Sequence, residues 1–109
     1  MPTSYEILGQ INPAANTLTN VFVTTASSSA IVGSITIHNF SDANASYSIV
    51  VRPINETLAS KHHIIRGGIV PARELITITG AVTMNSSVIL AANTNSSSIT
   101  FNAYGGEIT

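Results

Sequence analysis

Apolar and polar residues alternate along short segments of this chain, and that alternation is the feature that most limits its fold. Between Ala30 and Phe40, Ile31, Ile35 and Ile37 alternate with polar residues such as Thr36. A period of two residues is that of a β-strand with one face turned to a core. Turn-forming residues separate such segments at short, even intervals, a pattern typical of a β-sandwich or barrel.

The pattern predicts strands over residues 5–8, 18–25, 30–40, 47–52, 62–65, 75–79, 87–92 and 98–104. Ser41–Asn44 has turn composition, so we expect segments 30–40 and 47–52 to form a hairpin. Glycines at 67–68, 80 and 105–106 are expected to end the strands before them. Residues 55–61 are the single candidate for a helical turn. The sequence thus predicts an almost entirely β chain.

The length of 109 residues fits one domain, because two cores within this length would each be too small. We therefore expect a single β domain over residues 1–109. Gly9 and Pro13 break regular structure near the start, so residues 1–16 could form an extended N-terminal arm. Charged residues make up only 8% of the chain, against roughly 25% in an ordinary soluble domain. The surface must therefore be polar through Ser, Thr and Asn.

The few charges are unevenly distributed, and this distribution limits the partners. The net charge is −1, and the four basic residues are too sparse to neutralise a run of phosphates, which argues against nucleic acid. No stretch approaches the roughly 20 apolar residues of a membrane helix, and residues 1–10 do not resemble a signal peptide. Segments 7–41 and 75–106 contain no charge. Strand edges without charged residues favour pairing with another chain, so we expect homo-oligomers.

The sequence offers few candidates for catalytic or metal-binding chemistry. His62 and His63 are adjacent, and in a strand they would point to opposite faces, which argues against a shared metal ion with His38 as a third ligand. No two of the five carboxylates are paired in sequence as glycosidase chemistry would suggest, and no serine lies in a nucleophile-elbow motif. We expect no enzyme activity and no cofactor.

One charged cluster stands out in the middle of the chain, formed by Lys61, Arg66, Arg73 and Glu74. It could be a solvated loop or edge, because surface ion pairs contribute little to stability. It could instead be a docking surface on which ion pairs fix the register of a partner. The three tyrosines, at positions 5, 47 and 104, are expected at the edge of the core, where one could serve as an interface anchor.

Several short motifs, taken in their order along nearly the whole chain, resemble those of small virion structural proteins of tailed phages, particularly phages of marine bacteria and cyanobacteria. These motifs are Leu8-Gly9-Gln10 with Pro13-Ala14-Ala15, Ile35-Thr36-Ile37-His38-Asn39, Ile49-Val50-Val51-Arg52-Pro53, Leu58-Ala59-Ser60-Lys61-His62-His63-Ile64, and Phe101-Asn102-Ala103-Tyr104-Gly105-Gly106-Glu107-Ile108.

The resemblance implies a compact antiparallel β-sandwich, immunoglobulin-like or jelly-roll-like, present in many copies on a virion. The leading hypothesis is a capsid decoration or cement protein that stabilises the phage head by binding between capsid subunits. Its partners would be the major capsid protein or tail proteins, together with further copies of itself. The alternatives are a tail, neck or baseplate component and a carbohydrate-binding module. The last is opposed by the absence of Trp, since sugar platforms usually present exposed aromatic residues.

Overall fold

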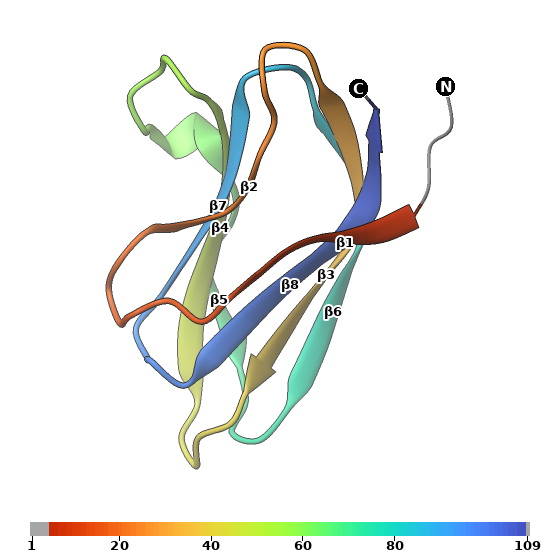
Figure 1. Ribbon diagram of the computed structural model, residues 1–109. Coiled ribbons are helices and arrows are strands. Elements are labelled where there is room, and N and C mark those ends of the chain that lie inside the picture. Colours follow the sequence, from red (N-terminus) through yellow and green to blue (C-terminus); the bar gives the residue numbers. More distant parts are fainter. Residues whose placement is uncertain (1–4, 109) are drawn as a thin grey trace.

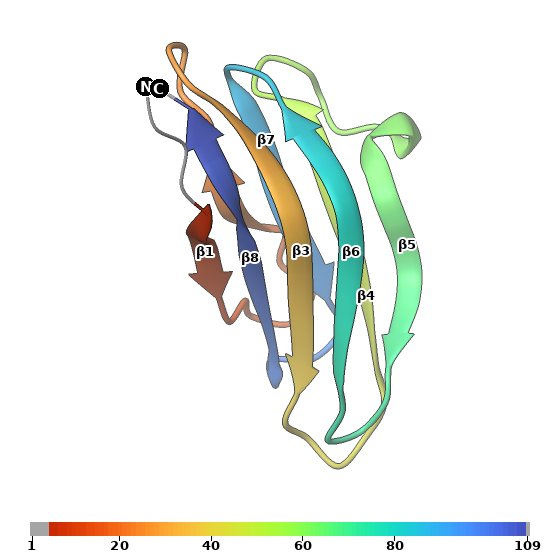
Figure 2. The same ribbon diagram turned by 90° about the vertical axis from the view of Figure 1, so that its right-hand side faces the viewer.

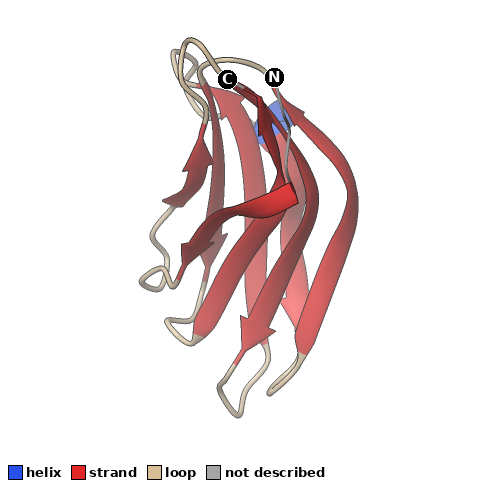
Figure 3. Cartoon of the chain, turned by 45° about the vertical axis from the view of Figure 1, so that its right-hand side comes forward, coloured by secondary structure: helices blue, strands red, loops and turns tan. Residues whose placement is uncertain are grey.

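The structure is a computed structural model that describes the backbone of residues 5–108 and the side chains of residues 6–80 and 82–107. Its elements, in chain order, are β1 (Tyr5–Ile11), β2 (Thr19–Val23), β3 (Ser29–Asn39), β4 (Ala45–Pro53), the 3-10 turn η1 (Ser60–His62), β5 (His63–Val70), β6 (Leu75–Met84), β7 (Val88–Thr94) and β8 (Ile99–Ile108). Figure 3 shows that strands dominate the described chain.

The strands form two four-stranded antiparallel sheets that pack face to face (Figures 1 and 2). One sheet has the order β1-β8-β3-β6 and the other has the order β2-β7-β4-β5. Only β4 and β5 are consecutive neighbours within one sheet, so every other connection crosses from one sheet to the other. Eight strands in two interleaved sheets of this order form a jelly roll. The predicted all-β sandwich is confirmed, in its jelly-roll form.

The predicted hairpin between segments 30–40 and 47–52 is wrong. β3 pairs with β6 and β8, whereas β4 pairs with β5 and β7 in the opposite sheet. The polar turn at Ser41–Asn44 therefore carries the chain across the sandwich. Two adjacent alternating segments joined by a turn are compatible with either arrangement, because a strand in a sandwich can bury its apolar face without pairing with its neighbour in sequence.

The core lies between the two sheets and is almost wholly aliphatic. Phe101 is the largest side chain that is completely buried, and the ring of Tyr47 meets its ring edge-on at a centroid distance of 6.4 Å. Ile99, Phe101 and Ala103 of β8 all point inward, as their alternation predicts. In the register of the sheet, Phe101 lies between Ile11 on β1 and Ile37 on β3.

The alternation along β3 changes phase in the middle of the strand. A β-bulge lies between Val32 and Ser34 in its pairing with both neighbours. Val32 is buried before the bulge, and Ile35 and Ile37 are buried after it. Ile31, which the uniform alternation placed with Ile35 in the core, is 48% exposed. An extra residue in one strand shifts a period-two pattern by one position, and so moves every side chain before it to the other face.

Glycine does not end the strands where the sequence predicted. β5 continues through Gly67-Gly68, β6 through Gly80, and β8 through Gly105-Gly106. Gly80 has a φ of 132° and lies in the part of β6 that faces the bulge of β3, so a glycine is used there to bend a continuing strand. At Gly105 a Cβ atom would collide with the carbonyl oxygen of Ile31, because the neighbouring strand approaches closely.

Two further segments differ in detail from the sequence-based expectation. Residues 5–11 of the proposed N-terminal arm form the edge strand β1, which pairs with β8, while residues 1–4 lie outside the described residues. The helical turn expected over residues 55–61 is present only as the 3-10 turn Ser60–His62. The remaining residues of that segment form an irregular connection between β4 and β5.

Replacing Ser87 by glycine is expected to raise the free energy of unfolding by about 0.5–1 kcal/mol. Ser87 has a φ of 58°, a conformation that is unfavourable for a residue with a Cβ atom and free of strain for glycine. Its backbone N–H donates to Thr25 and its carbonyl accepts from Ile54, so the turn keeps both bonds in the variant. Urea unfolding of Ser87→Gly measures the effect. Ser86→Gly is the control, expected to be neutral or slightly destabilising.

Candidate functional site

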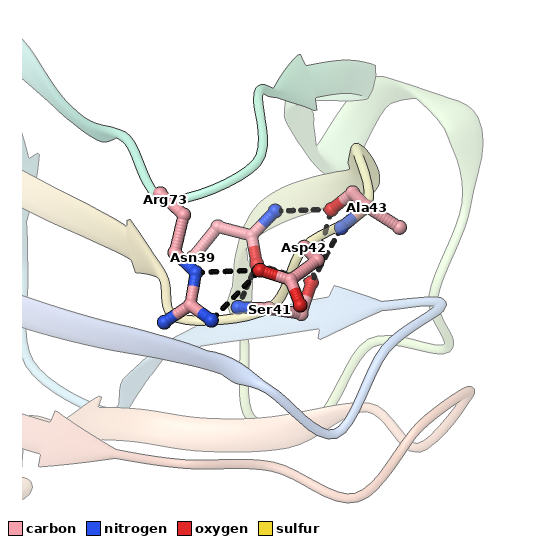
Figure 4. Close-up of polar contacts among 5 residues, drawn as sticks. All are labelled: Asn39, Ser41, Asp42, Ala43 and Arg73. Carbon is pink, nitrogen blue, oxygen red and sulfur yellow. Dashed lines mark hydrogen bonds and ion pairs between the residues drawn. The ribbon is translucent and has the colours of Figure 1, made fainter.

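Arg73 and Glu74, two members of the predicted charged cluster, lie in the turn between β5 and β6. The Arg73 guanidinium contacts the Asp42 carboxylate through Nη2 at 2.7 Å and Nε at 2.8 Å, which joins this turn to the β3–β4 turn (Figure 4). Both side chains are largely exposed, at 65% and 87%. Both contacts end on the same oxygen, Oδ1 of Asp42, and at this exposure the pair contributes little to stability.

Lys61, the third member, lies at the other end of β5 in the turn η1. Its Nζ is 3.2 Å from Oε1 of Glu56, and Nε2 of His62 is 3.1 Å from the same oxygen. Nδ1 of His62 accepts a hydrogen bond from the backbone N–H of Ala59 at 2.9 Å. The hydrogen bonds from His62 and Lys61 lower the pKa of Glu56 below its usual value of 4.5.

Arg66, the fourth member, is exposed in the middle of β5 and donates to the hydroxyl of Ser60 at 3.2 Å. The four residues therefore do not form one cluster. Lys61 and Arg66 lie toward the η1 end of β5, and Arg73 and Glu74 lie beyond its other end. Neighbours in sequence became separated because a strand of eight residues stands between them, and a strand extends by about 3.3 Å per residue.

His62 is buried, with 6% of its surface exposed, and it belongs to η1 rather than to a strand. The argument from alternating strand faces therefore does not apply to the pair His62 and His63. His62 is engaged with Glu56 and Ala59, whereas Nδ1 of His63 is buried with no hydrogen-bond partner. Within residues 5–108, no three His, Cys, Asp or Glu side chains gather in an arrangement that could hold a metal ion.

Residues 54–62 cover part of the outer face of the sheet β2-β7-β4-β5 (Figure 1). Arg52 ties this segment to β4 by donating to the Glu56 carbonyl at 2.8 Å. Three buried residues do not belong to the main core, namely Val50, Ile89 and Ala91. Their neighbours in sequence point into the core, so these three lie on the opposite, outer face of the sheet. They form a small second apolar layer, which explains why β7 is buried on both faces over residues 88–92.

Stability should fall when the pH drops below the usual carboxyl range, and Glu56 should account for part of the fall. Because its pKa is lower in the folded chain than in the unfolded chain, its contribution is complete above pH 4.5 and is lost as the pH falls through the folded pKa. Urea unfolding between about pH 2.5 and 7 measures the free energy of unfolding. Below about pH 4.5, this free energy should fall less steeply with decreasing pH in Glu56→Gln than in wild type. An equal slope in both proteins would contradict the assignment.

A polar hollow of about 110 Å³ opens beside β4 and β7. Its lining is uncharged and consists of Asn16, Ser46, Tyr47, Ser48, Asn93, Thr94 and Asn95. The side-chain oxygen of Asn93 is buried and has no hydrogen-bond partner. Buried acceptors are normally paired, so this oxygen is an exception, and it is shielded from solvent although Asn93 belongs to the lining. Sequence reasoning missed this hollow, because its residues come from three separate segments.

The outer face of the sheet β1-β8-β3-β6 presents an uncharged surface, which we call the neutral face. Residues between inward-pointing neighbours, such as Thr36 and Asn102, project from it. The register aligns its residues in three rows across the strands. The rows are Ile7-Tyr104-Ser34-Thr79, Gln10-Asn102-Thr36-Thr77 and Thr100-His38-Leu75. None of these residues is Asp, Glu, Lys or Arg.

Exposed apolar side chains accompany these hydroxyl and amide groups. Ile7 is 58% exposed and lies directly opposite Tyr104, and Leu75 is 56% exposed at the edge of the sheet. Tyr104 is half-buried on the neutral face, whereas Tyr47 is in the core, where burial raises the pKa of its phenol. The side chain of Tyr5 lies outside the described residues. The signal for the neutral face was the long charge-free segments, although the sequence could not show that they share one sheet.

No helix within residues 5–108 is long and apolar enough to cross a membrane. The chain matches no protein-family model and no curated protein sequence. Among solved structures, it is similar to a chain in the structure of infectious bursal disease virus, Gt strain, with a TM-score of 0.41 and 10% sequence identity. The similarity covers 97% of this chain and 30% of that chain, and a likeness this distant does not assign a function.

Proposed function

We propose that this chain is a virion structural protein that decorates the head of a tailed phage and stabilises it by binding between capsid subunits. The neutral face is the observation that supports this role most directly. It offers a broad sheet surface whose hydroxyl and amide groups can enter an interface without an oppositely charged group opposite them. The exposed side chains of Ile7 and Leu75 lie beside these groups. The jelly roll is also a recurrent fold of viral capsid domains, although lectin domains and cupins share it.

Stabilisation would come from many repeated contacts. A single sheet face of this size can bury only a modest interface, but symmetry repeats the same contact over the whole shell. Uncharged polar groups suit such a surface because their desolvation is less unfavourable than that of charged groups when pairing is imperfect. The proposal therefore predicts binding that is saturable and only weakly sensitive to salt.

The test adds purified chain to heads of a tailed phage that were assembled without their decoration protein. Binding should reach a fixed number of copies per head and raise the temperature at which the heads break. Asn102→Arg, in the middle of the neutral face, should weaken binding by about tenfold or more, because it buries an unpaired charge. Asn20→Arg, exposed on β2 in the other sheet, is the matched control. Failure of wild type to bind or stabilise such heads would refute the proposal.

A tail, neck or baseplate component is the alternative within the same class. The neutral face would serve there equally well, since it specifies the chemistry of a contact and not its place on a particle. Immunogold labelling of intact virions with an antibody against this chain separates the two locations. Label on the head supports decoration, and label confined to the tail replaces it with the alternative.

A carbohydrate-binding module is favoured by a different observation, the uncharged polar hollow beside β4 and β7, whose lining includes Asn93. Sugar hydroxyl groups are neutral donors and acceptors, and the amide and hydroxyl side chains of this lining could exchange hydrogen bonds with them. A glycan array probed with wild type and with Asn93→Ala tests this function. Binding to a defined glycan that Asn93→Ala abolishes and Asn44→Ala retains would support it, and no binding by wild type would dismiss it.

A further inference from the structure

Strand β6 is an open edge of the sandwich, because it pairs with β3 on one side only (Figure 2). The backbone N–H of Asn39 donates to the carbonyl of Glu74 at 3.0 Å, which fixes the phase of this antiparallel ladder. Residues that bond to the partner strand alternate with residues whose N–H and C=O groups point away from it. Ile76 and Ile78 therefore bond to β3, and Leu75, Thr77 and Thr79 direct their backbone groups to the open side.

The usual protections of an edge strand are missing from residues 75–79 of β6, the part before the irregularity at Gly80. Natural edges are blocked by lysine or other charges, by proline or by short length, and β6 has ten residues with no charge and no proline. The other three edge strands differ. β1 contains Glu6, β5 contains Arg66 and two irregularities in its pairing, and β2 has five residues interrupted by a bulge.

The segment Leu75–Thr79 also fits a second copy of itself. Its sequence, Leu-Ile-Thr-Ile-Thr, is nearly symmetrical about Thr77. In an antiparallel pairing centred there, Thr77 lies opposite Thr77 of the other copy. Ile76 then lies opposite Ile78, and Leu75 lies opposite Thr79. Cross-strand pairs of β-branched residues are favourable, and a neutral strand meets its own copy without like-charge repulsion.

We propose that β6 is a homodimerisation edge, at which two copies join antiparallel about a two-fold axis through Thr77. The backbone groups of Leu75, Thr77 and Thr79 would exchange hydrogen bonds with their counterparts, which joins the β1-β8-β3-β6 sheets of both copies. The half-buried side chains of Ile76 and Ile78 would be covered by the second copy. An isologous contact of this kind closes on itself and leaves the neutral faces of both copies continuous.

The extent of the contact limits its strength. Pairing runs only over Leu75–Thr79, because Gly80 has a φ of 132° and lies where the pairing with β3 is interrupted. One short edge buries less surface than a standard protein interface, so we expect a dissociation constant of roughly 1 μM to 1 mM. Sedimentation equilibrium of the purified chain over that concentration range measures it directly, and a chain that stays monomeric throughout would refute the proposal.

Charge substitutions at the two-fold axis provide the specific test. Thr77 is exposed, so Thr77→Lys and Thr77→Glu should fold normally while placing like charges directly opposite each other. Each variant alone should dimerise about tenfold more weakly or worse, and an equimolar mixture should recover at least wild-type affinity as a heterodimer. Thr83→Lys, exposed on the same strand beyond the bulge, is the matched control. A dimer that Thr77→Lys leaves unchanged would show that another surface is used.

A single cysteine provides a second measurement that reports geometry. The chain has no cysteine of its own, so Thr77→Cys introduces one unambiguous thiol. Opposed residues of a hydrogen-bonded antiparallel pair have Cα atoms about 5.5 Å apart, within the range of a disulfide. Mild oxidation should convert Thr77→Cys into a covalent dimer much faster than Thr83→Cys. Equal rates for the two variants would contradict a two-fold axis at Thr77.

Discussion

Phe101→Ala should lower the free energy of unfolding by about 3–5 kcal/mol, the largest loss expected from any single substitution proposed for this chain. Phe101 is the largest side chain with no exposed surface. It lies in β8 between Ile11 of β1 and Ile37 of β3, and its ring meets that of Tyr47 from the opposite sheet. Alanine would leave a cavity at the point where both sheets meet, and the aliphatic neighbours can fill it only partly.

Chemical denaturation with urea measures the loss, and the slope of the transition should stay close to that of wild type if the fold is retained. Asn102→Ala is the control next in sequence. Its side chain projects from the neutral face, so we expect a change of about 0.5 kcal/mol or less. Phe101→Leu should lie between the two because it fills part of the cavity. A loss below about 1 kcal/mol for Phe101→Ala would mean that the sheets do not meet around this ring.

Asn39→Ala should lower the free energy of unfolding by about 2–4 kcal/mol, because it removes hydrogen bonds that join the β3–β4 turn to the end of β5. Asn39 is completely buried, and its amide uses its full capacity. Figure 4 shows its bonds to Ser41 and Ala43. Nδ2 donates to the carbonyls of Ala43 at 2.8 Å and Val70 at 3.2 Å. Oδ1 accepts from the backbone N–H and the hydroxyl of Ser41 at 2.9 and 2.8 Å.

Two further variants test whether the loss comes from the buried hydrogen bonds of Asn39 and not from any change in this turn. Asn44→Ala alters the same turn at an exposed asparagine that accepts one bond, from the N–H of Ala72, and should change stability by about 1 kcal/mol or less. Asn39→Asp keeps the acceptor but places a carboxylate against the Ala43 and Val70 carbonyls. Its deficit relative to wild type should therefore shrink as the pH is lowered and the carboxyl is protonated. Similar losses for Asn39→Ala and Asn44→Ala would contradict the buried role.

Much of the β character followed from the sequence, and the places where the prediction failed share a physical cause. The inward set Ile99, Phe101 and Ala103 was predictable because no irregularity interrupts the alternation there. Ile31 was misplaced because a bulge at Gly33 reverses the alternation, and a bulge is visible only in the pairing of two strands. The glycines at 80 and 105 have a similar explanation. Whether a glycine ends a strand or accommodates a close neighbour depends on that neighbour.

The candidate site was predicted less well than the fold. Lys61, Arg66, Arg73 and Glu74 are near one another in sequence, but the length of β5 separates them into two groups. The neutral face brings together residues of β1, β3, β6 and β8, which are distant in sequence. Its neutrality could be anticipated from the charge-free segments 7–41 and 75–106, and its existence as one surface could not. The hollow at Asn93 was equally hidden, since three segments contribute to it.

The sequence by itself indicated a single, almost entirely β domain with a surface poor in charge. Those properties follow from local alternation and composition, which act on each segment separately. The tertiary structure alone decided the jelly-roll order, the phase of each strand and the residues that share a surface. These depend on which strands pair and in what register, and both are fixed by contacts between segments far apart in the chain.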